Sequence, residues 1–162
     1  MADTKYNLLP LVADLSSRRL LNSLNSITPR SALVFVYDDT LEGEIRIVRQ
    51  TGLVTPPLVR INLPTVDAGV MIALTDGQSI IYAAGTNISL VGTGDVGDPR
   101  IVFQIDVTSV ALDAALAAEG GQFISAFFEV RLRVTSVDGA IIQDQVTIRE
   151  QCQIYKTGIP NP

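Results

Sequence analysis

Histidine is absent from the 162 residues of this chain. It is the commonest general base and the commonest metal ligand, and it activates serine and cysteine nucleophiles. Without it, every Ser–His and Cys–His arrangement is excluded. We therefore predict that the chain is not an enzyme, with no catalytic residue, no cofactor and no metal. An enzyme built on carboxylates alone is the remaining catalytic possibility.

Cysteine and tryptophan are nearly as scarce, with Cys152 alone and no tryptophan. A single cysteine cannot form an internal disulfide, and we expect it to be a small buried apolar residue. The lack of tryptophan leaves few aromatic platforms for sugars. A carbohydrate-binding module would have to line its groove with Tyr6, Tyr37, Tyr82 or Tyr155.

Charge is also sparse, because charged residues make up 18% of the chain whereas about 25% is usual. Hydrophobic residues reach 47% and the mean hydropathy is +0.32. This favours burial of surplus apolar surface against partner subunits. The net charge of −5 repels phosphate backbones, so we expect no nucleic-acid partner.

Long hydrophobic runs are missing as well, since none approaches the roughly 18 residues that span a bilayer. The short apolar stretch over residues 5–13 is broken by Pro10 and closed by Asp14, so it fails as a signal peptide. We expect synthesis in a cytoplasm, no secretion and no membrane partner.

Residues 1–30 differ from the rest in their hydrophobic pattern, because their apolar residues recur at helical spacing. Thr28-Pro29 would end such a helix. Two interpretations stay open: a helix packed on its own domain, or an arm that docks on a neighbouring subunit. Under the second, the assembly residues are Leu8, Leu11, Val12, Leu15, Leu20 and Leu24.

From Ser31 the pattern becomes that of short strands separated by turns, as in a β-sandwich. Residues 33–37 form a continuous apolar run, typical of a strand buried on both faces. Residues 109–119 predict a single connecting helix, stopped by Gly120-Gly121. The predicted fold is a mostly β, antiparallel sandwich (Ig-like or jelly-roll-like) over residues 31–156, with an N-terminal helical arm (1–30) and a tail (157–162).

The most regular feature is a long hairpin that turns at Asp138-Gly139. Residues 128–134 alternate cleanly, and residues 142–148 return along the same face. Asp144 breaks that face, and burying it would be costly, so we expect a bulge or an edge there. Glu129, Arg131 and Arg133 share the opposite face and predict ion pairs rather than an anion site.

Two local motifs could carry chemistry. Residues 92–97 spell GxGxxG, but a strand follows where a dinucleotide site needs a helix. In the loop over residues 92–99, Asp95 and Asp98 could instead bind calcium, although two carboxylates are few. Asp38-Asp39, near Glu42 and Glu44, could suggest a glycosidase pair, but adjacent turn residues point apart and a solvated turn is the better interpretation.

Residues 103–148 resemble the C-terminal half of small Ig-like β-sandwich modules in tailed-bacteriophage virion proteins, such as baseplate and tail-fibre components. The matching segments are a strand, an Ala/Leu-rich helix ending in glycine, an alternating strand, an Asp-Gly turn and a return strand. They cover residues 105–108, 111–121, 127–134, 138–139 and 146–148. The resemblance spans about a quarter to a third of the chain.

The resemblance implies a structural component of a tailed-phage virion, in the tail, baseplate or fibre, or attached to the capsid as a fibre or decoration protein. Its expected partners are copies of itself, as a trimer or larger homo-oligomer, and other virion proteins. The alternative is a bacterial carbohydrate- or protein-binding Ig-like module.

Overall fold

The computed structural model describes residues 7–31, 33–61, 70–92, 97–120, 122–135 and 141–156. Within them lie the strands β1 (Asn7–Asp14), β2 (Arg19–Ser23), β3 (Ser26–Pro29), β4 (Leu33–Val36), β5 (Thr40–Gln50), β6 (Leu58–Arg60), β7 (Met71–Thr75), β8 (Ile81–Val91), β9 (Arg100–Asp106), β10 (Phe123–Thr135) and β11 (Ile141–Tyr155). The helix of this part of the chain is α1 (Val110–Ala118). The predicted mostly β class is therefore confirmed.

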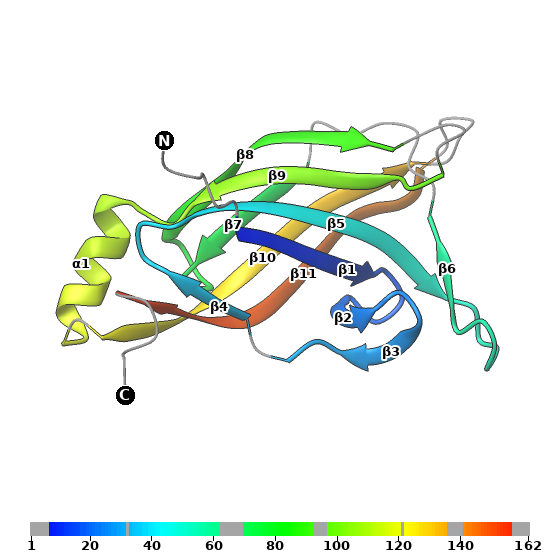
Figure 1. Ribbon diagram of the computed structural model, residues 1–162, viewed down its shortest axis with the longest axis horizontal. Coiled ribbons are helices and arrows are strands. Elements are labelled where there is room, and N and C mark those ends of the chain that lie inside the picture. The colour runs from blue at the N-terminus through cyan, green and yellow to red at the C-terminus, as the bar shows by residue number, and fades with distance from the viewer. Residues whose placement is uncertain are drawn as a thin grey trace.

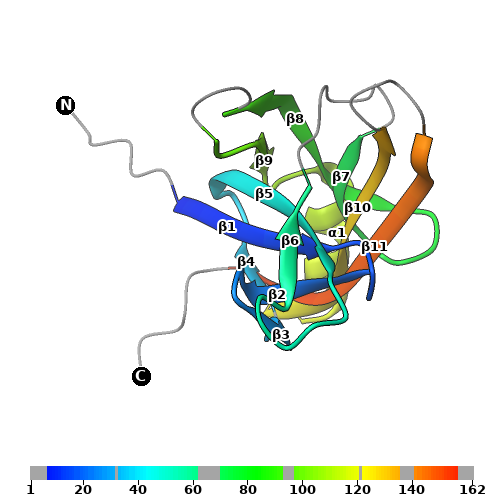
Figure 2. The same cartoon turned by 90° about the vertical axis from the view of Figure 1, so that its right-hand side faces the viewer.

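The strands follow one continuous path in the order β3-β2-β1-β5-β9-β8-β7-β10-β11-β4, with β6 paired to β5. The predicted antiparallel sandwich is not confirmed, because the sheet is mixed: β1 runs parallel to β5, and β4 runs parallel to β11. It curls around the core as a half-barrel with α1 at one end (Figures 1 and 2). The long strand β8 holds the two halves together, since it pairs with β7 early and with β9 later.

The predicted N-terminal helical arm is wrong, because residues 7–29 form three strands of this sheet. Leu11, Ala13 and Leu15 belong to the main core, whereas Val12 belongs to a smaller cluster with Leu21, Val48 and Leu58. This segment is thus apolar on both faces. Because apolar residues occur at both adjacent and alternate positions, the segment also matches the i, i+3, i+4 spacing of an amphipathic helix.

Pro10 fits this strand because its missing N–H falls where β1 is paired on one side only. β5 pairs with β1 along its length, but β2 joins it only from Val12 onward. A proline within a sheet is tolerated at such an unpaired edge. Asp14 then ends the strand, since its buried carboxylate accepts hydrogen bonds from the backbone N–H groups of Ser16 and Ser17 at 3.0 and 3.3 Å.

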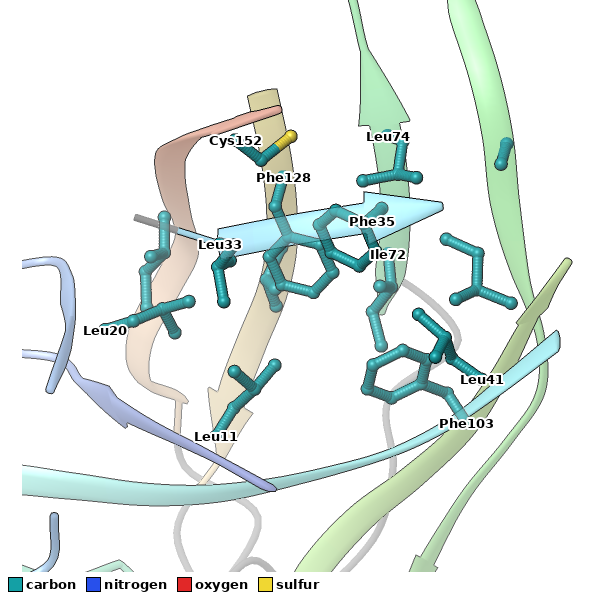
Figure 3. Packing of buried hydrophobic residues seen from close by; sticks show 14 of the residues in the cluster. Leu11, Leu20, Leu33, Phe35, Leu41, Ile72, Leu74, Phe103, Phe128 and Cys152 are labelled. Carbon is teal, nitrogen blue, oxygen red and sulfur yellow. The ribbon is translucent and has the colours of Figure 1, made fainter. Parts of the chain in front are cut away.

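Three aromatic rings from different parts of the sheet occupy the middle of the core (Figure 3). Phe128 on β10 lies 5.9 Å from Phe35 on β4 and 6.3 Å from Phe103 on β9, measured between ring centroids. All three are at most 2% exposed. Offset rings at these distances stabilise a core beyond the area they bury. They fix the two halves of the curled sheet against each other.

The predicted connecting helix is confirmed as α1. Ser109 is its N-cap, and its side-chain oxygen accepts a hydrogen bond from the Leu112 N–H at 3.0 Å. Leu112 and Leu116 are its buried residues, and α1 lies at one end of the half-barrel. Gly120 follows with φ of +79°, the left-handed conformation that glycine adopts without strain and that ends helices.

β4 corrects a second expectation, that residues 33–37 are buried on both faces. Leu33 and Phe35 are buried, but Val34 is 53% exposed. The physical reason is position, because β4 is the last strand of the sheet path and only one of its faces meets the core. A continuous apolar run does not distinguish a central strand from an edge strand.

The antiparallel pairing of the predicted C-terminal hairpin is confirmed, with β10 and β11 in register from Phe123↔Tyr155 to Leu132↔Val146. The Asp138-Gly139 turn itself lies outside the described residues. Beyond Leu132 the register shifts, and Asp144 and Gln145 together lie opposite Arg133. This is a β-bulge at the predicted position.

Candidate functional site

The six predicted assembly residues do not share one exposed surface. Leu11, Val12, Leu15 and Leu20 are each at most 9% exposed within the protomer. Leu24 is half-buried beside the small Val12 cluster, and Leu8 is 57% exposed. Packing on the chain's own sheet accounts for the four buried side chains. Contact with a neighbouring subunit through this set is thus limited to Leu8 and Leu24.

Asp98, one of the two candidate calcium ligands, is held by arginines. Arg46 donates to both carboxylate oxygens, from Nε at 3.0 Å and from Nη2 at 2.9 Å, and Arg60 Nη2 donates at 3.1 Å. The Arg46 guanidinium lowers the pKa of Asp98 well below its usual range. A carboxylate occupied by two guanidinium groups is a structural anchor for the loop. Asp95 lies outside the described residues.

The acidic segment near Asp38 does not form a carboxylate pair across a cleft. Asp38 is exposed in the turn between β4 and β5, with φ of +72°. Glu44 lies further along β5 and accepts from Arg46 at 3.1 Å and from Arg100 at 3.3 Å. Within the described ranges, no group of three or more Asp, Glu, His or Cys side chains could hold a metal ion.

Glu129 is a buried carboxylate, at 2% exposed. Arg131 Nε donates to it at 2.5 Å along the strand, and Arg149 Nε donates at 2.9 Å from β11. The predicted ion pairing is therefore confirmed for Glu129 and Arg131. The side chain of Arg133 is not described.

A pocket of about 800 Å³ lies where the C-terminal end of α1 meets β8 and β10. Its lining combines aromatic rings with polar groups, including Tyr82, Phe123, Glu119, Gln122 and Ser125. Phe123 is 41% exposed and packs against Tyr155, with ring centroids 5.3 Å apart. Burial raises the pKa of Tyr82, and the nearby carboxylates of Asp76 and Glu119 add to this. The hydroxyl therefore stays protonated and can donate a hydrogen bond.

A second feature is the turn between β5 and β6, at the end of the molecule opposite α1 (Figure 1). Leu53 and Val54 on this turn face solvent, at 66% and 94% exposed, and Val59 on β6 just after it is 39% exposed. We call Leu53, Val54 and Val59 the apolar tip. Sequence reasoning missed it, although the signal was present: two aliphatic residues between Gly52 and Pro56.

The apolar tip is held in a defined conformation by Thr51. The Thr51 N–H donates to the Pro57 carbonyl at 3.0 Å, and its hydroxyl donates to the Pro56 carbonyl at 2.8 Å. The same hydroxyl accepts from the Leu53 N–H at 3.0 Å. These bonds close the turn across its base. Leu53 and Val54 are thus presented outward on an ordered loop.

No helix in the described part of the chain is long and apolar enough to cross a membrane. Neither a scan against models of known protein families nor a search of characterised proteins gives a match to this chain.

Proposed function

We propose that the chain is a structural component of a tailed-phage virion that assembles with copies of itself and attaches to other virion proteins. Its place is in the tail, baseplate or fibre, or on the capsid as a fibre or decoration protein. The phage context rests on the resemblance of residues 103–148. The absence of histidine and the low charge content support a structural rather than a catalytic role.

The apolar tip is the observation that carries the proposal. Exposed aliphatic side chains usually lie singly on a protein surface, and grouped ones mark interaction sites. Here Leu53 and Val54 lie on a turn that is closed by hydrogen bonds, and Val59 lies on β6 just after it. Because the turn is already ordered, little conformational entropy is lost when it docks. Such an element suits stable contact with another subunit.

The test is the oligomeric state of the protein and of a tip variant, Leu53→Asn with Val54→Asn. Sedimentation velocity over a range of concentrations should show a trimer or larger assembly for the wild type. The tip variant should shift towards the single protomer. Both side chains are exposed, so the variant should keep the wild-type thermal unfolding midpoint.

Val34→Asn is the matched control, because Val34 is 53% exposed on β4 and is not part of the apolar tip. This variant should assemble like the wild type. A wild type that sediments as one protomer at all concentrations would overturn the proposal. Equal assembly of the tip variant and the wild type would exclude the tip as the contact.

The α1-end pocket favours a second candidate, carbohydrate binding. Sugars stack an apolar face on an aromatic ring, and Phe123 offers an exposed ring that packs against Tyr155. Tyr82, Gln122 and Ser125 provide hydrogen-bonding groups around it. Titration calorimetry against a panel of oligosaccharides, with wild type and Phe123→Ala, tests this candidate. Absence of any heat of binding across the panel would reject it.

A further inference from the structure

Exposed carboxylates gather at the α1 end of the molecule. The carboxylates whose residues are exposed in the described ranges are Asp38, Asp106, Asp113 and Glu119. The Asp38 N–H donates to the Val107 carbonyl at 2.7 Å, in the segment that leads into α1. Asp106 ends β9 and accepts from Thr40 at 2.8 Å. Lys156 is an exposed cation at this end.

Exposed arginines gather at the other end of the sheet, around the turn that joins β1 to β2. They are Arg18, Arg19 and Arg49, whereas Arg149, which is also exposed, donates to Glu129 on β10. Gln50, beside Arg49, donates its N–H to Ser16 in that turn at 2.9 Å. Arg19 pairs with Glu150, the neighbour of Arg149. No partner of Arg18 or Arg49 is found among the described residues.

The carboxylates at the α1 end and the arginines at the β1–β2 turn cannot neutralise each other within one protomer. β5 runs from Thr40, bonded to Asp106, to Arg49 and Gln50. At about 3.3 Å per residue, nine residues separate the charges by about 30 Å. The Debye length at physiological ionic strength is about 8 Å, so attraction over that span is screened. Only a second molecule can bring opposite charges into contact.

We infer that copies of this chain associate head to tail, with the carboxylates of the α1 end of one protomer against the arginines at the β1–β2 turn of the next. The inference rests on the proposed self-assembly and adds its direction and its chemistry. A second copy is the partner that the charges fit, because each protomer carries both complementary surfaces on an otherwise acidic chain.

Such a contact is heterologous, since the two surfaces that meet are different. Heterologous contacts generate closed rings or open filaments, whereas a symmetric dimer uses the same surface twice. The apolar tip lies towards the arginine end of β5, as Figure 1 shows, so it approaches the same neighbour. The tip then supplies apolar contact, and the charges set which end of the neighbour it meets.

The test uses charge reversal at exposed residues with no partner among the described ones. The acid-end variant is Asp113→Lys with Glu119→Lys, and the arginine-end variant is Arg18→Glu with Arg49→Glu. Each alone places like charges at the head-to-tail contact and should weaken self-association about tenfold or more. Mixing the two variants should restore assembly, because each then meets an opposite charge on the other. The variant with all four changes should assemble alone.

Sedimentation velocity at about 0.1 M and about 1 M salt gives the readout, since the Debye length falls from about 10 to about 3 Å. Wild-type association should weaken at the higher salt. Assembly that is unaffected by salt and by both reversals overturns the head-to-tail contact but leaves self-assembly standing. A wild type that is a single protomer under both conditions overturns both. Circular dichroism of each variant checks that it is folded.

Discussion

Gly43 on β5 lies directly opposite Phe103 on β9, and the Phe103 ring covers the glycine. A Cβ atom at position 43 would overlap the outer atoms of that ring. Phe103 in turn packs against Phe128 in the middle of the core. The Phe103 ring therefore occupies the space that a side chain at position 43 would fill.

Gly43→Ala should destabilise the protein by about 1–3 kcal/mol, because the added methyl group forces a buried ring from its position. Urea unfolding followed by fluorescence or circular dichroism measures the change. The companion variant Gly43→Ala with Phe103→Leu frees space above position 43. It should cost less than the sum of the two single changes. Strict additivity would show that the ring does not constrain position 43.

Cys152 should be inert in the folded protein. It is 2% exposed, and burial raises the pKa of its thiol from 9.0 to about 12. The reactive thiolate is therefore scarce near pH 8, and an aromatic disulfide reagent should label the chain only in urea. Because the folded pKa is raised, the linked stability is present below pH 9.0 and is lost as the pH rises towards 12. Rapid labelling without denaturant would contradict this.

The ion pair between Arg19 and Glu150 joins β2 to β11, which lie near opposite ends of the sheet path. Arg19→Met should lower the urea midpoint, because it leaves a largely buried carboxylate without its guanidinium. Adding Glu150→Gln to Arg19→Met should recover part of the loss, since a neutral amide needs no counter-charge. Arg30→Met is the control. If the double variant is no more stable than Arg19→Met, the pair does not explain the loss.

Asp98 should make the protein sensitive to acid. The arginines that hold it lower its pKa below the ordinary value of 3.8. Its contribution to stability is then present above pH 3.8 and is lost as the pH falls through the folded pKa. Asp98→Asn should lower the urea midpoint at neutral pH and reduce the further fall on acidification. An equal acid dependence in wild type and variant would contradict this role.

Much of the fold could be predicted from local sequence patterns. The alternation of Ile101, Phe103 and Ile105 placed these side chains in the core correctly. The helix followed from its Ala/Leu composition and its glycine stop. What local patterns could not show was which strands pair across long separations. The two parallel pairings join segments about 34 and about 119 residues apart, and no turn signal marks such pairs.

The interaction surfaces were harder to predict than the fold, for a related reason. Arg18 and Arg49 are 31 positions apart in the sequence and gather only because β1 pairs with β5. Likewise, Leu53 and Val54 could have been core residues. Their exposure depends on the hydrogen bonds of Thr51 to Pro56 and Pro57, which are formed in three dimensions. Periodicity identifies faces of elements, but not which faces remain uncovered.

The parallel pairing of β4 with β11 has a consequence for biosynthesis. Leu33 pairs with Cys152, so β4 leaves the ribosome about 119 residues before its hydrogen-bonding partner exists. At about 5–20 residues per second, the wait lasts roughly 6–24 seconds. During this time the apolar residues Leu33, Val34 and Phe35 lack the strand that covers them in the folded protein. This nascent segment is where we expect a chaperone to bind, until translation of β11 gives it a place in the sheet.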